Sequence, residues 1–271
     1  MKKEEFLEKL ETELKLIKKS PLTIRNYKYF NSKLLDSVNK EPDALTEGDI
    51  KKFLAAMADK ASSSMILALA AIRFASSKIL GKDLTLNIER PKKEKTLPSV
   101  LSKDEIKALI ESAETKKSRL IIQFLYSTGL RVSELVNLKV QDLNLAEKTG
   151  IVRQGKGKKD RMFTLSEKSI SDIQAYLNEH PQNTYLFSET EPLTTRNIQK
   201  IIKHTAKKAQ IQKKVTPHTL RHSYATHLLE SGTDIRVIQT LLGHENLNTT
   251  QIYTHVSTEE LKKVKNPLDE L

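Results

Sequence analysis

The 271-residue sequence contains no cysteine and no tryptophan, and aromatic residues make up only 5% of it. The lack of cysteine excludes disulfides, thiolate zinc sites and cysteine nucleophiles together. Hydrophobic residues make up 38%, enough to fill a core. No apolar run approaches the roughly 20 residues needed to cross a bilayer. The first five residues lead into a charged amphipathic pattern without an apolar signal core, so we expect a cytoplasmic protein.

Acidic residues are outnumbered, with 34 Asp and Glu against 46 Lys and Arg and a formal net charge of +12. Residues 1–90 hold 17 basic and 13 acidic side chains, and the remainder holds 29 and 21, so both parts are positive. This excess suits a protein that binds a polyanion with both parts. A membrane surface is the competing partner, but no expected helix pairs a basic face with one rich in Trp or Phe.

Residues 1–90 show helical periodicity and no strand pattern. Apolar residues recur at three- and four-residue steps as far as Ile17. The Ser-Pro pair at 20–21 predicts the end of this helix and the start of a second one. Thr46 begins a capping box that predicts a third helix, and a fourth is expected over 62–79. We therefore expect a small four-helix-type domain.

A linker is expected over 91–98, where two prolines bracket a charged stretch that is poor in apolar residues. Its lysines could lie along a phosphate backbone or could simply be solvated. A capping box of Ser102 with Glu105 opens the second domain, 99–271, and helices are expected to about Leu138.

The second domain also holds the only convincing strand patterns of the chain. Strands are expected at 140–143, 150–153 and 162–165, the last two joined by a hairpin turn. Further helices are expected to begin near Ser166, Thr194, Thr216, Thr233 and Asn248. The sequence thus predicts a mainly α protein with a small antiparallel β-sheet.

The segment 216–222 places two cationic side chains at a helix N-terminus. Thr216 is suited to the N-cap and Pro217 to the first helical position. His218 and Arg221 then lie three residues apart on one face, where free N–H groups and the helix dipole attract anions. The alternative is a surface helix with a scattered His and Arg. A metal site is disfavoured, because His218 is not followed by the Glu of a metalloprotease motif.

Three further sequence features do not indicate a function when each is taken alone. Gly243 predicts a helix end that leaves His244 in the following loop. Tyr253 falls one turn into an expected helix, where a packing role is the ordinary alternative. Glu134 follows Arg131 by one turn and can orient its guanidinium, or the two can form an ordinary surface salt bridge.

The order of these motifs along the chain is more specific to one family than any single motif. Arg131, a lysine-rich hairpin, His218-x-x-Arg221, Gly243-His244 and Tyr253 occur in the order and spacing of the tyrosine recombinase (phage integrase) family. The chain resembles Xer-type recombinases still more closely, over nearly its whole length. The resembling strings are STGLRVSEL at 127–135, TPHTLRHSYATHLLESG at 216–232, LLGH at 241–244 and TTQIYTHV at 249–256.

The resemblance implies a reaction and a role for each residue. In this family a tyrosine displaces a deoxyribose 5′ oxygen and forms a 3′-phosphotyrosine, so rejoining needs no ATP. Tyr253 would be that nucleophile, Arg131 and Arg221 would hold the charge that develops on phosphate, and His244 would add a donor. His218 would take the tyrosine proton. The hairpin lysine that protonates the leaving oxygen would be Lys156, with Lys158 and Lys159 as alternatives. The family uses no metal or other cofactor.

The resemblance also implies partners and an assembly. The first domain would be a core-binding domain on double-stranded DNA, the second a catalytic domain, and four protomers would act on two sites through a Holliday junction. A capping box at 257–260 begins a tail helix that is exchanged between protomers in this family, although packing on its own domain is the alternative. The protein would be nucleoid-associated. Candidate DNA-binding residues are Lys92, Lys93, Lys95, Arg153, Lys158, Lys159 and Arg161.

From the resemblance to Xer-type recombinases, we expect the protein to resolve chromosome or plasmid dimers. A mobile-element integrase would use the same catalysis, and a type IB topoisomerase is a more distant enzymatic alternative. A catalytically silent DNA-binding module is the alternative from another class, and the intact set of six candidate residues argues against it. The DNA sequence that is recognised does not follow from this chain, because phosphate contacts carry no base information.

Overall fold

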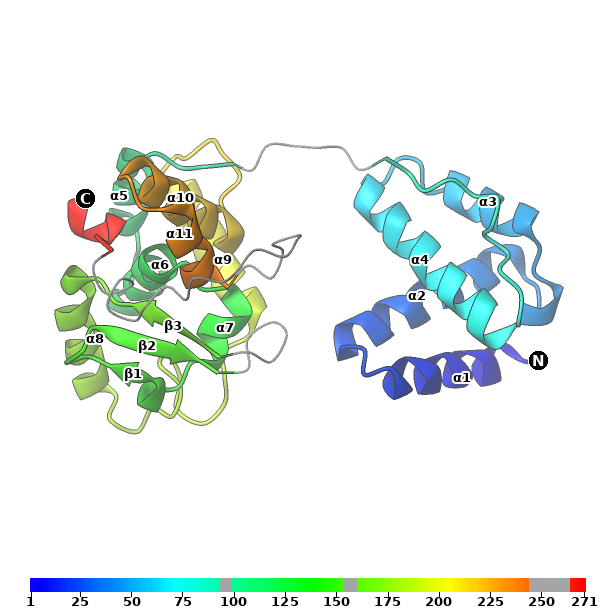
Figure 1. Ribbon diagram of the computed structural model, residues 1–271, viewed down its shortest axis with the longest axis horizontal. Helices are drawn as coiled ribbons and strands as arrows, with labels where there is room; N and C mark the ends of the chain where they lie inside the picture. Colours follow the sequence, from blue (N-terminus) through cyan, green and yellow to red (C-terminus); the bar gives the residue numbers. More distant parts are fainter. Residues whose placement is uncertain (93–98, 154–159, 244–263) are drawn as a thin grey trace. The chain divides into compact units, whose positions relative to one another are not determined.

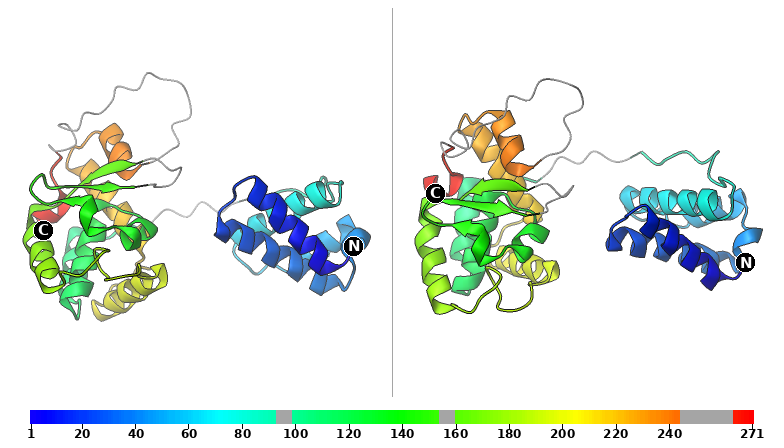
Figure 2. Two further views of the ribbon diagram at one scale, coloured as in Figure 1. Left: turned by 90° about the horizontal axis from the view of Figure 1, so that it is seen from below. Right: turned by 60° about the horizontal axis from the view of Figure 1, so that its bottom comes forward.

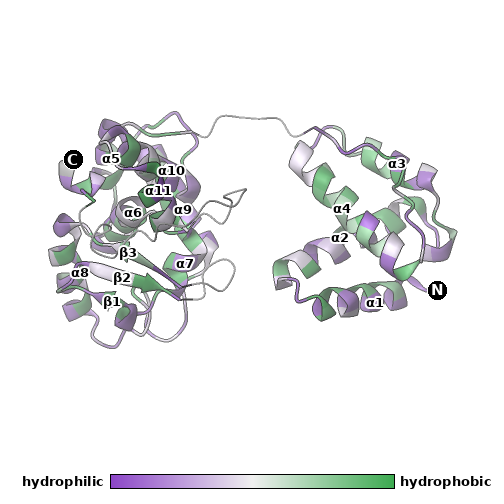
Figure 3. Ribbon diagram, viewed as in Figure 1, coloured by the Kyte–Doolittle hydropathy of each residue, from purple (hydrophilic) through white to green (hydrophobic). Residues whose placement is uncertain are grey.

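The computed structural model describes residues 1–92, 99–153, 160–243 and 264–271. Its contacts divide the chain into two compact units, Met1–Thr96 and Leu97–Leu271, here called the N-terminal unit and the C-terminal unit (Figure 1). Polar residues interrupt the apolar ones along each labelled helix (Figure 3). Within the described ranges, no helix is long and apolar enough to cross a membrane.

The N-terminal unit is a small helical domain, as the periodicity predicts. Its elements are α1 (Lys3–Leu16), α2 (Pro21–Val38), the 3-10 turn η1 (Pro42–Ala44), α3 (Glu47–Ala55) and α4 (Ser62–Ile79). Two predicted helix starts are confirmed, because Ser20 caps α2 and Thr46 forms a capping box with Asp49 before α3. The alanines on one face of α4 are buried, which lets α4 pack closely on α1 and α2. Asn31 of α2 donates to the Ala71 carbonyl of α4 at 3.1 Å.

The C-terminal unit is mostly helical around a small sheet. Its elements are α5 (Lys103–Glu111), α6 (Lys116–Thr128), α7 (Val132–Asn137), η2 (Val140–Asp142), β1 (Leu143–Asn144), β2 (Thr149–Val152), β3 (Arg161–Thr164), α8 (Glu167–Glu179), α9 (Thr195–Lys208), α10 (Pro217–Glu230), α11 (Ile235–Leu242) and η3 (Pro267–Glu270). Helix α6 is central, since it contacts α5, α8, α9, α10 and η3 and buries most of its side chains. The expected fold class, mainly α with a small antiparallel sheet, is confirmed.

The sheet has the order β1-β2-β3, and both pairs are antiparallel. Gly150 lies opposite Phe163, so the two strands of the expected hairpin pair as predicted. The prediction of a strand over 140–143 was wrong for its first three residues, which form the turn η2. Asp142 explains the difference, because its side chain accepts the Lys139 N–H at 3.2 Å and so closes a local turn instead of a ladder.

The C-terminal segment 264–271 packs on its own unit. The Asn266 side chain donates to the Ser127 carbonyl at the end of α6 (2.7 Å), and Leu268 is buried. Asp269 accepts from the backbone N–H of Lys168 in the first turn of α8 at 3.1 Å. Both views of Figure 2 show this red segment beside α8. The expected tail helix after residue 257 lies outside the described residues up to 263.

Candidate active site

Three arginines from distant parts of the chain converge on the C-terminus of α11. Arg131 precedes α7, Arg161 begins β3 and Arg221 lies in α10. Each donates a hydrogen bond to a different backbone carbonyl at the end of α11, where helix carbonyls have no intrahelical partner. The three bonds are Arg161 Nε to Leu241 O (3.1 Å), Arg221 Nη2 to Leu242 O (2.6 Å) and Arg131 Nη2 to Gly243 O (3.1 Å). Cations here also complement the negative end of the helix dipole.

Local sequence explains how α10 delivers Arg221. Thr216 accepts from the Thr219 N–H at 3.2 Å and Pro217 takes the first helical position, as predicted. Arg221 follows one turn later and is 6% exposed. Its Nη1 donates to the Gly129 carbonyl at 2.5 Å, which ties α10 to the end of α6.

Arg131 is delivered by the sharp passage from α6 to α7. Helix α6 ends at Gly129 in the left-handed region, and Arg131 occupies the N-cap of α7 with extended backbone. Glu134 accepts from both the backbone N–H and Nη1 of Arg131, each at 2.7 Å. The predicted pairing of Glu134 with Arg131 is therefore present. The pair is no ordinary surface salt bridge, because the Glu134 side chain is only 6% exposed.

Arg161 is one of the residues expected to bind DNA. Its side chain is 11% exposed and lies inside the cluster. Its Nη1 and Nη2 donate to the two carboxylate oxygens of Glu134 at 2.8 and 2.7 Å. Glu134 therefore holds two arginines, and the sequence pattern indicated only one of them. We call Arg131, Arg161, Arg221 and Glu134 the arginine cluster.

The cluster carries three positive charges and one negative charge in a partly buried place. Burial, followed by the neighbouring charges of Arg131 and Arg161, lowers the pKa of Arg221 to about 10. Arg221 remains charged at neutral pH. Burial opposes the ionised form of Glu134, but hydrogen bonds and charge from Arg161, then from Arg131, hold its pKa below the usual value. The net charge of about two positive units suits a phosphate group.

His218 is exposed at the start of α10, one turn before Arg221 and on the same helix face. His222 is also exposed, and burial followed by the charges of His218 and Arg221 lowers its pKa. Among the residues that the structure describes, no group of three His, Asp or Glu side chains could hold a metal ion.

Two described tyrosines of the C-terminal unit are unsuited to nucleophilic attack. Tyr224 is 1% exposed, and burial raises its pKa. Tyr126 is fully buried, with its hydroxyl 2.8 Å from His227 Nδ1. The expected nucleophile Tyr253 lies outside the described residues, as do the other expected residues of the hairpin, the linker and the loop after α11. These are Lys93, Lys95, Lys156, Lys158, Lys159 and His244.

Two of these residues nevertheless belong to segments that begin or end beside the cluster in the sequence. Gly243, whose carbonyl holds Arg131, immediately precedes His244. Arg161 follows the hairpin segment 154–159, which contains Lys156. Chain connectivity thus attaches both segments directly to cluster residues.

A row of basic residues on α9 was missed in the sequence reading. Arg196, Lys200, Lys203 and Lys207 recur at helical spacing, all are exposed, and the helix contains no acidic residue. Within the described part of the chain no ion pair involves these four. Helix α9 packs against α7 and α10, which carry cluster residues at their starts. The signal that could have found this row is the periodic alternation of lysine with Ile198 and Ile202.

The other two described candidates for DNA contact are exposed. Lys92 lies at the end of the described N-terminal unit. Arg153 ends β2, its side chain is 59% exposed, and its Nε donates to Asp142 at 2.7 Å. That hydrogen bond and charge raise the pKa of Arg153.

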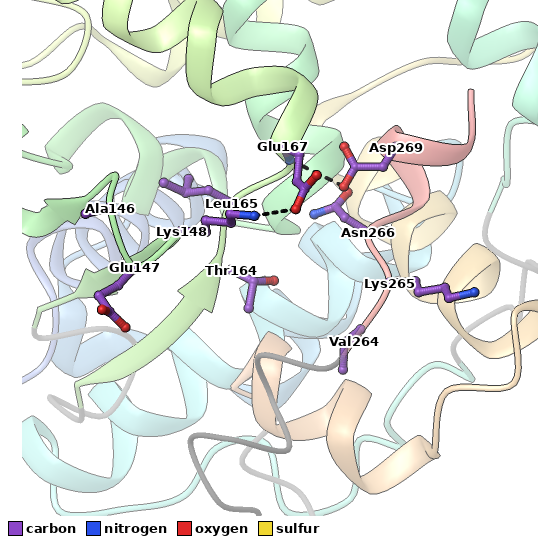
Figure 4. Close-up of a pocket in the computed structure, with 10 residues that line it drawn as sticks. All are labelled: Ala146, Glu147, Lys148, Thr164, Leu165, Glu167, Val264, Lys265, Asn266 and Asp269. Atoms are coloured by element: carbon purple, nitrogen blue, oxygen red, sulfur yellow. Dashed lines mark hydrogen bonds and ion pairs between the residues drawn. The ribbon is translucent and has the colours of Figure 1, made fainter.

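A hollow of the C-terminal unit lies away from the arginine cluster. It has a volume of about 540 Å³ and lies between the β1–β2 turn, β3 and the C-terminal segment (Figure 4). Lys148 pairs with Glu167 at its edge, and Glu167 and Asp269 meet on the same side. No member of the arginine cluster lines it, and its three acidic lining residues outnumber its two lysines, so it is a poor site for a phosphate.

Comparison with known proteins agrees with this geometry. Residues 99–260 match the model of the phage integrase family, and residues 6–86 match the phage integrase N-terminal SAM-like domain. The tyrosine recombinase XerA of Pyrococcus furiosus is 44% identical over 270 residues, covering 96% of this chain and 92% of its own. A crystal structure of XerA recombinase is similar with a TM-score of 0.53 at 37% identity, covering 96% of both chains.

A third relative is the XerH site-specific recombinase bound to its difH substrate in a pre-cleavage complex. It is similar with a TM-score of 0.69 at 26% identity, covering 89% of this chain and 78% of that one. The family match spans more than half of the chain, and the identity to XerA extends over nearly all of it. This chain therefore belongs to the phage integrase family and is a tyrosine recombinase similar to the Xer type.

Proposed function

We propose that this enzyme cuts and rejoins double-stranded DNA at a specific site through a 3′-phosphotyrosine link, with Tyr253 as the nucleophile. The observation that carries the proposal is the arginine cluster, in which Arg131 and Arg221 are held on one side by carbonyls of the α11 end. Each guanidinium has five N–H donors, and two are engaged in each by described partners. The remaining donors can bind the non-bridging oxygens of a phosphate.

The reaction would use the cluster as a preorganised electrostatic site. Attack by Tyr253 Oη on phosphorus adds negative charge to the non-bridging oxygens, and Arg131 and Arg221 would stabilise that charge. Both are fixed by backbone carbonyls, so little reorganisation is needed as charge develops. His244 would donate a further hydrogen bond to the same phosphate.

Two proton transfers complete the step. A phenol titrates at about 10, so it must lose its proton to become an effective nucleophile at neutral pH. His218, exposed on the face of α10 that carries Arg221, would accept this proton. Lys156 of the hairpin would protonate the departing 5′ oxygen, with Lys158 and Lys159 as the alternatives. The free 5′ hydroxyl of another strand would later reverse the reaction and release Tyr253.

DNA would be held by basic surfaces on both units. Candidate contacts are Lys92, Lys93 and Lys95 near the boundary of the units, Arg153 beside the hairpin and the basic row of α9. The related XerH in its DNA complex supports this partner. We infer a tetramer on two DNA sites that exchanges strands through a Holliday junction. For the tail to pass between protomers, segment 264–271 would have to leave its present contacts with α6 and α8. This enzyme would act in the cytoplasm on the nucleoid.

Resolution of chromosome or plasmid dimers is the biological role we favour, because the similarity to Xer-type recombinases extends over nearly the whole chain. Integration of a mobile element would use the same chemistry. A recombination assay on a plasmid with two directly repeated sites separates these roles, since resolution needs two like sites and integration joins two different ones.

The decisive experiment is covalent trapping on a nicked duplex that carries candidate sites, without metal or ATP. Wild type should form a slowly migrating protein–DNA adduct that EDTA does not prevent. Tyr253→Phe should form none, whereas the matched control Tyr185→Phe should react like wild type. An adduct with Tyr253→Phe would refute the assigned nucleophile. DNA binding by wild type without an adduct on any site would favour a silent binding module.

A further inference from the structure

The contacts of Arg161 give it a part in the reaction that differs from phosphate binding. Its two terminal nitrogens donate to the two oxygens of Glu134, and its Nε donates to Leu241 O. Building on the proposed function, we propose that Arg161 is a positioning residue. It neutralises Glu134, so that this carboxylate can orient Arg131 without weakening the charge that Arg131 offers to phosphate.

Glu134 uses its whole acceptor capacity within the cluster. Oε1 accepts from Nη1 of both Arg131 and Arg161, and Oε2 accepts from the Arg131 backbone N–H and from Arg161 Nη2. A carboxylate offers about four lone-pair sites, so all of them are occupied. Both Glu134 and the guanidinium of Arg161 are thereby held in one geometry.

The orientation of Arg161 separates it from the two proposed phosphate ligands. Both of its terminal nitrogens face the carboxylate of Glu134. The donors of Arg221 are directed instead to the neutral carbonyls of Gly129 and Leu242. Arg161 is therefore committed to an anion of the protein, which leaves Arg131 and Arg221 for an anion of the substrate.

Charge balance explains why a second arginine is needed. A carboxylate beside a phosphate repels the charge that develops during attack, and this repulsion is strong where water is scarce. Glu134 alone would orient Arg131 but would also oppose the anion that Arg131 binds. The ion pair of Glu134 with Arg161 has no net charge, and Glu134 still accepts two hydrogen bonds from Arg131.

Arg161 also links β3 to the end of α11. Besides its bond to Leu241, its Cδ lies so near Gly243 that a Cβ there would approach it to 2.8 Å. The residue that leads out of the hairpin is thus packed on the residue that precedes His244. This contact joins the start of β3 to the end of α11, the two described ends from which the chain continues to the expected Lys156 and His244.

Loss of Arg161 has a signature that a purely structural role would not produce. The charged groups that face Glu134 are Arg131, Arg161 and Arg221. Without Arg161, the hydrogen bonds and charge that most lower the pKa of Glu134 are lost, whereas burial, the largest single influence, still raises it, so this pKa should rise. Above that pKa the unbalanced carboxylate opposes phosphate, and below it the carboxyl is neutral. The deficit of Arg161→Met relative to wild type should therefore grow as pH rises from 5 to 8.

The test compares rates of adduct formation for wild type, Arg161→Met, Glu134→Gln and the double variant across this pH range. Arg161→Met should be slower on the order of 10- to 100-fold at pH 8, the size typical of losing a group that orients a catalytic one. The double variant should be faster at pH 8 than Arg161→Met, with a ratio to wild type that does not vary with pH. Arg73→Met is the control, because the Arg73 guanidinium also donates hydrogen bonds within its own unit, two of them to Thr85, but lies in the N-terminal unit. It should retain the wild-type rate and pH profile.

A second readout needs neither DNA nor activity. In protein labelled with ¹³C at glutamate carboxyls, the Glu134 signal, assigned by its loss in Glu134→Gln, should not titrate between pH 5 and 8 in wild type and should titrate there in Arg161→Met. A carboxyl that stays ionised in Arg161→Met would overturn the inference. So would a double variant that is no faster than Arg161→Met at every pH. If wild type forms no adduct, the proposed function fails, and the carboxyl titration still decides the role of Arg161.

Discussion

Gly129, at the end of α6, packs directly against side chains of α10 and α11. Its φ is +60°, and a Cβ there would lie 2.6 Å from Tyr224 Cδ1 and 2.7 Å from Leu242 Cδ2. Both neighbours are 1% exposed, so neither can swing into solvent. Gly129→Ala would add about 1–2 kcal/mol for the left-handed backbone and about 1–3 kcal/mol for overpacking. We expect a total destabilisation of roughly 2–5 kcal/mol.

Gly232→Ala is a matched control in the same unit. Gly232 also has a positive φ, +86°, but a Cβ there meets nothing within 4 Å. Its substitution should cost only the backbone part, about 1–2 kcal/mol. Thermal unfolding followed by calorimetry should therefore show a lower Tm for Gly129→Ala than for Gly232→Ala. The expected difference is roughly 2–12 °C, at about 2–4 °C per kcal/mol for a unit of this size.

Gly129→Ala should also slow DNA cleavage below the melting temperature. The Gly129 carbonyl accepts from Arg221 Nη1, and Leu242, which must move, holds Nη2 of the same guanidinium. The adduct assay should therefore show a loss for Gly129→Ala that Gly232→Ala does not share. Equal melting temperatures and equal rates for the two variants would refute this reasoning, because they would mean that Tyr224 and Leu242 yield freely.

Three further predictions concern other parts of the molecule. His227 is 4% exposed, and burial lowers its pKa. As the pH drops through about 6.5, the unfolded chain therefore takes up this proton before the folded chain does, and the free energy of unfolding should fall. Denaturant titrations at pH 7 and pH 5 should show a smaller fall in this free energy for His227→Gln than for wild type. Thr46→Ala removes the cap of α3 and should cost the N-terminal unit about 1 kcal/mol, whereas Thr12→Ala, which changes an exposed mid-helix residue, should cost less in the same unfolding experiment. Lys203→Gln and Lys207→Gln should each lower the slope of log binding constant against log salt by about one in DNA titrations, while Lys116→Gln, at a site 85% exposed on α6, should leave the slope unchanged.

Local signals in the sequence predicted the helix starts well. Ser20, Thr46, Ser102 and Thr216 each cap a helix where expected, because a cap depends on residues three positions apart in the chain. A local interaction also explains the wrong strand prediction that began at Val140. There the apolar run favoured a strand, but Asp142 closed a turn within the same few residues.

The sequence by itself determined the family, the helical character of both units and the identity of the candidate catalytic residues, because these follow from local spacing and from the order of motifs. Only the tertiary structure decided the partners of those residues. Glu134 is 27 residues from Arg161, and Arg131 is 112 residues from Gly243, so no periodicity or cap connects them. The burial of Arg161 and the packing of segment 264–271 on its own unit were equally inaccessible. Exposure and charge balance depend on which distant surfaces meet, and that is settled by packing of the whole unit.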